Sequence, residues 1–473
     1  MARLKIILMY PNFKWIDKWE NRTMWQLHPY NLCLLSAMIE QKYDVKIVDA
    51  NIDNLAKEEF IELIKAEKPD IICVSVLTNE YSESGLIAAK IAKEINPNIK
   101  LIFGGVAARS DPEPIIKCQY IDFVIFGEGE YVLKELCDHF NGDTELPKKG
   151  ILYKKEDKII NLGRADFIKN LDEIPFPSYH KVDFMKYATK IQRESVDRPR
   201  DIPYAHILTS RGCPFNCCFC QVGTISGKIP RCRSPENIIA EIEGLIKDYG
   251  IKALILDDDN LLINRDRAKK IFELMIKKDF KLKWIAIALA AYKLDEELID
   301  LMKLSGCQYV DIAIESGVER VLKDIIHKPV NLEYAKRMSH KIKEVGIDLA
   351  ANFVIGFPGE TWDEIRQTIK FAEELDADYT KIFIATPFPN TELYRLAKEK
   401  GYLKNDYGKA VWAEGYIETE EFRPQDLKIL RAYEWDRLNF SNPKKKKKIA
   451  KMMDISESRL NEIRKETLKE ISP

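Results

Sequence analysis

Four cysteines crowd into one short segment near the middle of the chain. Cys213, Cys217 and Cys220 form a C-x3-C-x2-C pattern, and Cys218 stands next to the second of them. Three thiolates at this spacing on one loop can each hold one iron of a four-iron cubane cluster, so that the fourth iron has no protein ligand. A structural zinc site is a weaker alternative because it needs a fourth, suitably spaced ligand. We therefore predict a 4Fe-4S cluster on Cys213, Cys217 and Cys220, with Cys218 as a bystander.

The elements around this loop form an alternating series of strands and helices. A partial barrel is predicted, because six βα units are too few for the eight of a complete barrel. The cysteine loop directly follows the first strand. The six predicted strands cover residues 206–210, 253–256, 284–288, 309–314, 349–355 and 379–384, and the helices between them include 236–248, 266–276, 296–304 and 362–375.

Polar and glycine residues stand where several of these strands end, at the face where barrel active sites gather. Asp258 follows the second strand, Glu315 and Ser316 end the fourth, and Gly356 and Phe357 follow the fifth. A carboxylate at this face can accept charge-assisted hydrogen bonds from an ammonium or from ribose hydroxyls. For Asp258 helix capping is an equal alternative, and Gly356 can be a simple turn residue. Glu315 is the stronger candidate because its strand is otherwise apolar.

The first part of the chain has a second alternating pattern. Five predicted strands (4–9, 45–48, 71–76, 100–103 and 123–126) alternate with helices (32–40, 57–65, 84–94 and 131–140), which predicts a doubly wound, Rossmann-like parallel sheet. A ligand of such a sheet binds over the carboxyl ends of the strands. No G-x-G-x-x-G motif opens the first helix, so a nicotinamide dinucleotide is disfavoured.

The composition and net charge exclude several classes of protein. The net charge of −1 argues against a general nucleic-acid binder, and no apolar run approaches the length of a membrane span. Ten cysteines are too few for a disulfide scaffold, and no signal peptide is recognised, so a cytoplasmic protein is expected. The lysine run 444–448 is interpreted as the solvated start of a helix.

The predicted organisation has four parts. Residues 1–145 form the Rossmann-like domain, and residues 146–200 form a linker that contains a hairpin at 150–161. Residues 201–400 form the partial (β/α)6 barrel, and residues 401–473 form a mainly helical C-terminal region. In that last region Trp412, Tyr416 and Trp435 are candidates for substrate walls, although a core role is the better expectation for any one of them.

A cysteine loop after the first strand of a six-unit barrel resembles the radical S-adenosylmethionine (SAM) superfamily. Further motifs are similar to the subfamily with an N-terminal cobalamin (B12)-binding domain. They are Ile102-Phe103-Gly104-Gly105, Gly127-Glu128-Gly129-Glu130, Leu171-Asp172-Glu173-Ile174-Pro175-Phe176-Pro177, Ala313-Ile314-Glu315-Ser316-Gly317, Gly356-Phe357-Pro358-Gly359-Glu360-Thr361 and Thr386-Pro387-Phe388-Pro389-Asn390-Thr391.

The resemblance implies that SAM binds the open iron and is cleaved by electron transfer to a 5′-deoxyadenosyl radical. It further implies methylation of an unactivated carbon in a small-molecule, lipid or peptide substrate, with a ferredoxin or flavodoxin as electron donor. The SAM-binding residues it implies are Phe219, Asp258, Glu315, Ser316, Gly356 and Phe357. The cobalamin-binding residues it implies are Asn51, Ser75, Leu77, Thr78, Gly104, Gly105, Gly127, Glu128 and Gly129.

Two departures from the subfamily pattern matter. Asn390 replaces the glycine of a Pro-Gly-Thr motif, and because asparagine tolerates the left-handed conformation the turn is expected to survive. The Asp-x-His-x-x-Gly motif that supplies a lower cobalt ligand elsewhere is missing, and residues 49–53 stand at the matching turn. The alternatives that remain are a radical SAM cyclase or carbon–carbon coupling enzyme, a methylthiotransferase, and a non-catalytic cobalamin or iron–sulfur sensor.

Overall fold

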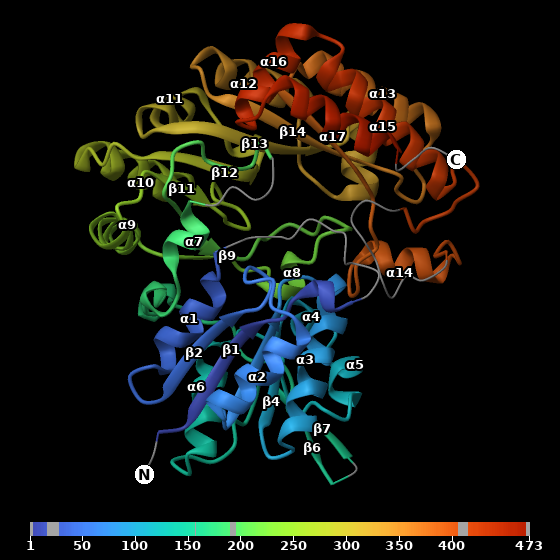
Figure 1. Cartoon of the computed structure of the whole chain (residues 1–473). Coiled ribbons are helices and arrows are strands. Elements are labelled where there is room, and N and C mark those ends of the chain that lie inside the picture. Colours follow the sequence, from blue (N-terminus) through green and yellow to red (C-terminus); the bar gives the residue numbers. More distant parts are fainter. Residues whose placement is uncertain (1–2, 17–27, 157, 190–194, 405–414, 470–473) are drawn as a thin grey trace. The chain divides into compact units, whose positions relative to one another are not determined.

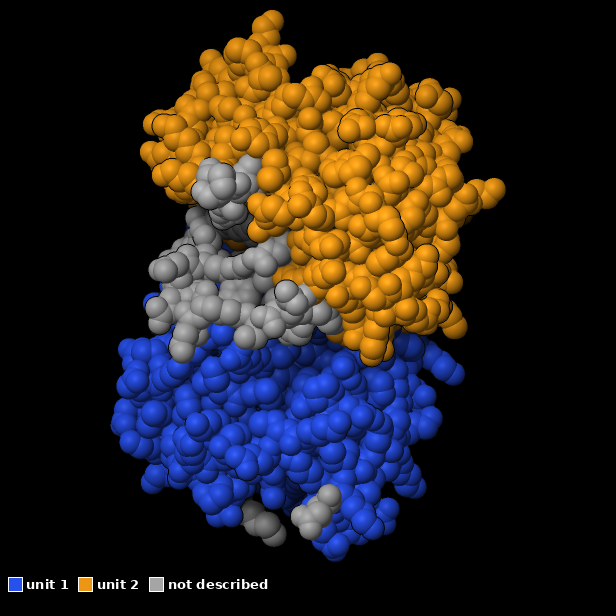
Figure 2. Space-filling model, turned by 90° about the vertical axis from the view of Figure 1, so that its right-hand side faces the viewer, with its two compact units in different colours: residues 1–193, 224–226 blue, residues 194–223, 227–473 orange. Residues whose placement is uncertain are grey.

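The protein is described from a computed structural model, which covers residues 3–16, 28–156, 158–189, 195–404 and 415–469. The chain forms two compact units, one of residues 1–193 with 224–226 and one of residues 194–223 with 227–473 (Figure 2). Within the described ranges, no helix has both the length and the apolar character needed to cross a membrane.

The first unit is built on a seven-stranded sheet. Its strand order is β2 (Asp44–Asp49), β1 (Lys5–Tyr10), β3 (Ile71–Val76), β4 (Lys100–Gly105), β5 (Phe123–Ile125), β6 (Ile151–Lys155) and β7 (Lys158–Asn161). The first five strands are parallel, as predicted. The predicted hairpin forms β6 and β7, but it is not part of a linker: it extends the sheet by antiparallel pairing with β5.

Helices cover both faces of this sheet (Figure 1). Ile6 and Leu8 of β1 pack into one core, whereas Ile7 and Met9 pack into the other, because alternate side chains of a strand point to opposite faces. The doubly wound prediction is therefore confirmed. One core is covered by α1 (Tyr30–Ile39) and α6 (Gly129–Phe140), and the other by α2 (Lys57–Glu67), α3 (Ser82–Ile95), α4 (Val106–Ser110) and α5 (Pro112–Lys117).

The second unit contains the predicted six-stranded parallel sheet, in which neighbours in space follow the chain order. The strands are β8 (Tyr204–Ile207), β11 (Ala253–Leu256), β12 (Lys283–Leu289), β13 (Cys307–Glu315), β14 (Asp348–Ile355) and β15 (Tyr379–Ile384). The helices between them are α9 (Pro235–Tyr249), α10 (Arg265–Lys278), α11 (Glu296–Leu304), α12 (Leu332–Glu344) and α13 (Trp362–Leu375).

The first barrel strand is shorter than predicted. It ends at Ile207, and β9 (Ser210–Arg211) instead pairs antiparallel with β10 (Arg231–Cys232). The cysteine loop therefore starts from a two-stranded ribbon beside the main sheet.

The C-terminal region is helical, as expected. Its described helices are α15 (Pro424–Phe440), α16 (Pro443–Met452) and α17 (Glu457–Lys469), and α14 (Glu392–Glu399) precedes it at the end of the predicted barrel part. The lysine run does begin α16, but it is not wholly solvated, because Lys448 pairs with Asp378 at 2.7 Å. Tyr416 is buried in the core, whereas Trp435 is partly buried and packs edge-on against the core residue Phe440. Trp412 lies outside the described residues.

Candidate active site

Of the four cysteines in the loop, Cys218 is more deeply buried than the other three. Cys213 and Cys217 are half-buried and Cys220 is exposed, whereas Cys218 is buried. The Cys218 backbone N–H donates to the Ile326 carbonyl at 3.0 Å, and its own carbonyl accepts from the Leu393 N–H at 2.8 Å. Cys218 thus anchors the loop to the protein and leaves the predicted ligands at the surface of the loop.

Two aspartates after β11 hold the backbone just before Cys213. The Asp258 carboxylate accepts from the Thr209 N–H at 2.8 Å and from the Ser210 hydroxyl at 2.8 Å, and Asp259 accepts from the Gly212 N–H at 2.7 Å. Burial raises the pKa of Asp258 to about 6, against the lowering effect of these donors. In this structure the Asp258 carboxylate therefore positions the backbone that leads into the cysteine loop.

The turn after β15 supports the loop from another side. Asn390 has a φ of 61°, so the expected left-handed turn is confirmed. The neighbouring Pro389 carbonyl accepts from the Gln221 side-chain amide at 3.0 Å, just beyond the last cysteine. The sixth strand therefore ends in a turn that fixes the end of the cysteine loop.

Glu315 lies at the end of β13, with only 7% of its surface exposed and a φ of 75°. Its carboxylate forms an ion pair with Lys328 at 2.7 Å. Glu315 contributes to the electrostatic environment of Cys217, so the structure brings this predicted residue to the cysteine loop. Lys328 was missed by the sequence analysis, since nothing in its local sequence distinguishes it from the other basic residues.

Among the remaining predicted SAM contacts, two aromatic rings contact each other, and one hydroxyl is buried in a hydrogen bond within the protein. The Phe219 and Phe357 rings lie 5.8 Å apart, which joins the cysteine loop to the end of β14. The Ser316 hydroxyl is instead buried, 3.0 Å from the Thr368 hydroxyl, and it accepts from the Val318 N–H. Ser316 therefore caps a turn, and its side chain is unavailable for the predicted contact.

Glu360 shapes the turn that carries Gly356 and Phe357. Its carboxylate accepts from both of their backbone N–H groups, at 2.7 and 3.0 Å. Burial raises the pKa of Glu360 to about 7, and the two N–H donors oppose that rise. Gly356 has a φ of 88°, and a Cβ there would lie 2.4 Å from Leu427, so this position requires glycine.

The cysteine loop suits a cluster. In the part of the chain that the structure describes, no three His, Cys, Asp or Glu side chains are close enough to share one metal ion. The cysteines of a cubane bind different irons and so lie further apart than the ligands of one ion. Burial raises the pKa of Cys217 to about 12, so cluster binding must displace its thiol proton.

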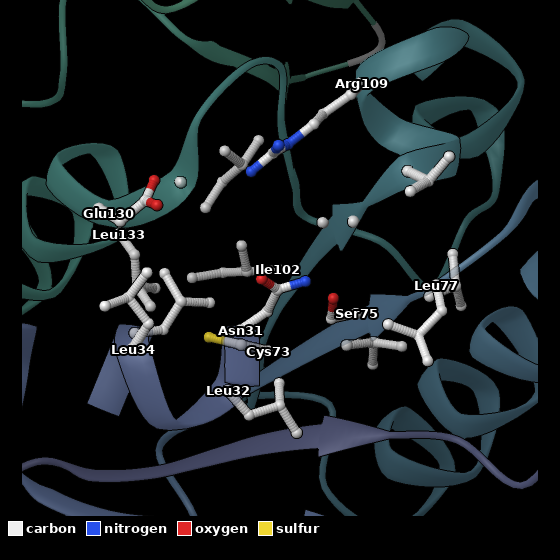
Figure 3. A pocket seen from close by; sticks show the side chains of 18 of the residues that line it. Asn31, Leu32, Leu34, Cys73, Ser75, Leu77, Ile102, Arg109, Glu130 and Leu133 are labelled. Carbon is white, nitrogen blue, oxygen red and sulfur yellow. The ribbon is translucent and has the colours of Figure 1, made fainter. Parts of the chain in front are cut away.

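The first unit has a pocket at the carboxyl edge of its sheet (Figure 3). It encloses about 750 Å³, open solvent at its mouth included. Its walls are mostly apolar, with the Arg109 guanidinium reaching in from α4. The lining residues include Asn31, Leu32, Leu35, Cys73, Ser75, Leu77, Ile102, Gly104, Gly105, Arg109, Ile125, Gly127, Gly129, Glu130 and Leu133.

Two glycines of β4 contribute to the open space of this pocket. At Gly104 an added Cβ would meet no heavy atom nearer than the Val74 carbonyl oxygen at 4.0 Å, so it would project into the pocket. Gly105, with a φ of 90°, has a different role, because a Cβ there would lie 2.3 Å from the Val76 carbonyl oxygen. Gly104 therefore leaves space for a ligand, while Gly105 lets the backbone turn.

Six of the nine predicted cobalamin residues line this pocket: Ser75, Leu77, Gly104, Gly105, Gly127 and Gly129. Asn51 lines an adjoining pocket with Tyr10, Asp49 and Tyr81, and this pocket shares Ser75 and Leu77 with the first. Thr78 and Glu128 line neither of these two pockets. The Glu128 carboxylate is buried and accepts from the Ile168 N–H at 2.7 Å, so it holds the chain after β7.

Asn31, Arg109 and Glu130 are polar lining residues that the sequence analysis missed. Asn31 lies in the first turn of α1 and Glu130 in the first turn of α6. Helices that follow parallel strands begin at the carboxyl edge of the sheet, so polar residues in their first turns were a usable signal. Arg109 lies in the last turn of α4, where no such signal exists.

The partial barrel with its cysteine loop, and the parallel sheet with a glycine-lined pocket at its carboxyl edge, define a class of enzyme that combines an iron–sulfur site with a second cofactor. Residues 207–372 match the radical SAM superfamily, and residues 25–137 match the B12 binding domain. The chain belongs to the radical SAM superfamily, in the group whose members carry a B12 binding domain.

Relatives in this group include methyltransferases and cyclases. The chain is 36% identical over 373 residues to the uncharacterized methyltransferase PH0819 of Pyrococcus horikoshii, covering 78% of each chain. It is 28% identical to the cytidylyl-2-hydroxyethylphosphonate methyltransferase of Streptomyces wedmorensis, covering 79% of this chain and 76% of that one. It is also 29% identical to the anaerobic magnesium-protoporphyrin IX monomethyl ester cyclase of Rubrivivax gelatinosus, covering 76% and 63%.

Two solved structures share the fold. The cobalamin-dependent SAM radical enzyme OxsB, with aqua-cobalamin and SAM bound, superposes with a TM-score of 0.71 at 19% identity, covering 99% of this chain and 72% of that one. The radical SAM methyltransferase TsrM from Kitasatospora setae, with tryptophan and a SAM analogue bound, gives a TM-score of 0.70 at 17% identity, covering 93% and 90%. The predicted fold class is confirmed.

Proposed function

We propose that this radical SAM enzyme transfers a methyl group to an unactivated carbon of a small-molecule, lipid or peptide substrate. The observation that carries the proposal is the cysteine loop, in which three thiols are presented and the fourth cysteine is anchored through its backbone. The 36% identical relative described as a methyltransferase supports methyl transfer over other outcomes.

Cys213, Cys217 and Cys220 would hold the 4Fe-4S cluster. Such a cluster, when reduced, supplies the electron that cleaves the SAM sulfonium to a 5′-deoxyadenosyl radical. Glu315 offers a carboxylate for the SAM ammonium, since charge-assisted hydrogen bonds of this kind are about twice as strong as neutral ones. Phe219, with the Gly356–Phe357 turn, would flank the adenosine.

The pocket in the first unit would hold cobalamin, which supplies a carrier for the methyl group. Its apolar walls and the open space at Gly104 suit a large flat ring system. Ser75, Leu77, Gly104, Gly105, Gly127 and Gly129 would contact that group, with Asn51 in the adjoining pocket. Protein groups of this kind orient the cofactor and exclude water, while the cofactor carries the chemistry.

A ring-closing or coupling reaction is the second candidate function. The observation in its favour is the 29% identity to an anaerobic cyclase over 76% of this chain. In either case the enzyme needs one-electron reduction, and we propose a ferredoxin or flavodoxin as the donor.

The test uses the full chain, reconstituted anaerobically with iron and sulfide and reduced with dithionite. With SAM labelled in its methyl group and added cobalamin, we expect 5′-deoxyadenosine and labelled methyl groups on the cobalamin. The Cys213/Cys217/Cys220→Ala variant should form no 5′-deoxyadenosine, whereas Cys218→Ala should match the wild type.

The two candidate functions separate in this experiment. 5′-Deoxyadenosine without any methylation of cobalamin would favour the cyclase or coupling reaction. The absence of 5′-deoxyadenosine from a preparation that holds a full cluster would contradict the proposal altogether.

A further inference from the structure

A largely enclosed lysine, Lys328, lies beside the cysteine loop and has no assigned role. The side chains of Lys328 and Glu315 are only 11% and 9% exposed, and the ammonium lies 2.7 Å from the Glu315 carboxylate. Burying an ammonium is costly unless it is paired, and an ion pair this enclosed is weak evidence for a purely stabilising role. The placement of Lys328 therefore calls for another explanation.

Both residues of this ion pair stand at or next to positions with uncommon backbone conformations. Glu315 has a φ of 75° at the end of β13, a conformation that costs a residue with a side chain about 1–2 kcal/mol. Lys328 comes shortly after a π-helix at Val321–Ile326 and directly after His327, which has a φ of 64°. π-Helical turns and left-handed residues concentrate at functional sites, because strain there persists only where the surroundings enforce it.

The same π-helix contacts the cysteine loop. The Lys328 N–H donates to the Leu322 carbonyl at 2.8 Å, and the Ile326 carbonyl accepts from the Cys218 N–H at 3.0 Å. The backbone that positions the lysine is thus bonded directly to the loop that carries the cluster ligands.

Lys328 lies within electrostatic reach of two of the three proposed cluster ligands. Burial by itself lowers the pKa of Lys328, but the negative charge of Glu315, and of the Cys217 and Cys220 sulfurs when they are thiolates as in a cluster, outweighs it, so that the pKa is raised. The charged groups that act most strongly on Cys217 are Lys328, Cys220, Glu315 and Cys213, and in that set Lys328 is the cation. Its charge is therefore placed to act on the cluster.

We propose that Lys328 is a positioning residue that sets the reduction potential of the cluster, with Glu315 opposing it. This inference rests on the proposed function, because it requires the cluster on Cys213, Cys217 and Cys220. One-electron reduction by an external donor adds a negative charge to the cluster and changes no bond. A fixed positive charge nearby favours the reduced state, and a fixed negative charge disfavours it.

The two residues should consequently have effects of opposite sign. In the absence of SAM, Lys328→Met should shift the reduction equilibrium at least tenfold toward the oxidised cluster, which for one electron is 59 mV. Glu315→Gln should shift it toward the reduced cluster, and Lys328→Arg, which keeps the charge, should stay near the wild type. Lys323→Met removes an exposed lysine from the same π-helix and is the matched control.

The measurement is a dithionite titration of the reconstituted full chain, followed by electron paramagnetic resonance of the reduced cluster, with iron counted in each sample. Opposite shifts for Lys328→Met and Glu315→Gln at full iron content are the expected result. Shifts of the same sign, or none, in iron-replete protein would overturn the inference and leave the proposed function intact.

Two further outcomes are informative. If Lys328→Met loses its iron, Glu315→Gln and Lys328→Arg still decide, since an unchanged or lowered potential in Glu315→Gln overturns the inference. If the wild type itself assembles no cluster on the three cysteines, the proposed function fails and the inference fails with it.

Discussion

The cysteine loop of the second unit and the pocket of the first unit are built in different ways. Buried or partly buried charged groups hold the loop: Asp258 and Asp259 bind its backbone, and the Glu315–Lys328 pair lies beside it. The pocket instead has apolar walls and owes its open space to glycines, notably Gly104.

This difference predicts what each site is sensitive to. A loop held by charged groups in a medium of low dielectric is destabilised when one charge is removed, because the hydrogen-bond partners of that charge are left unsatisfied. A pocket defined by its shape loses affinity for its ligand when a larger side chain fills it. Each prediction below changes one property at one site and asks whether the other site stays intact.

The largest effect is expected at Asp258. Asp258→Ala should leave the buried Thr209 and Ser210 donors without an acceptor, at a cost of about 3–5 kcal/mol in the free energy of unfolding, since each unsatisfied buried group costs about 1–3 kcal/mol. Urea unfolding and iron content after reconstitution measure this, and both should drop. Asp266→Ala, which changes an exposed aspartate on α10, is the control, and an equal loss there would refute a specific role for Asp258.

A slightly smaller effect is expected when the pocket is filled. In the series Gly104→Ala, Gly104→Val and Gly104→Phe, cobalamin affinity should fall with each increase in size, by about 100-fold or 2.8 kcal/mol for phenylalanine. Equilibrium dialysis measures the affinity, and unchanged thermal unfolding shows that the fold is kept. If the phenylalanine variant binds cobalamin normally, the ligand does not occupy this pocket.

The stability contributed by the Glu360 turn should depend on pH. The pKa of Glu360 is about 7 in the folded chain, above its ordinary 4.5, so the folded state holds an extra proton between these values. Stability should therefore fall as the pH rises through this window, by about 3 kcal/mol. Glu360→Gln has no such proton, so its urea-unfolding free energy relative to the wild type should rise over the same window; a flat difference would contradict the assignment.

Glu315→Gln should weaken SAM binding by about 1–3 kcal/mol, because it removes one charged hydrogen-bond acceptor and keeps the shape. Binding of SAM to the reconstituted chain is the measurement, and iron content should stay constant. An unchanged affinity would mean that Glu315 serves only its ion pair with Lys328.

The last prediction, with the smallest expected effect, is that no nitrogen of the protein binds the cobalt. Neither pocket, as far as the structure describes the chain, is lined by a histidine, and Asn51 stands at the turn where other cobalamin proteins place one. Electron paramagnetic resonance of the cob(II)alamin-loaded chain should show no splitting from a single nitrogen. Clear splitting would reveal a protein nitrogen ligand.

Local sequence was enough to predict the elements whose pattern is self-contained. Buried β3 was predicted with its observed bounds, residues 71–76, and Asn390 was expected to adopt the left-handed turn that it does adopt. The cysteine spacing likewise needs no tertiary information.

What could not be predicted depends on contacts between distant segments. Glu128 and Glu130 look equivalent in sequence, but α6 begins at Gly129, and only Glu130 lines the pocket. Asp258 turned toward the cysteine loop because β8 ends early and leaves the Thr209 and Ser210 donors free to bind it. Lys328 is brought to Glu315 by a π-helix, which has no recognised sequence signal.

The central claim is that one chain holds a cluster in one unit and cobalamin in the other, through independent sets of residues. Its most direct test is to count iron and cobalamin together in the reconstituted full chain. We predict four irons and one cobalamin for the wild type, cobalamin without the cluster for the Cys213/Cys217/Cys220→Ala variant, and the cluster without cobalamin for Gly104→Phe. A triple variant that keeps four irons, or a Gly104→Phe variant that keeps cobalamin, would contradict the account.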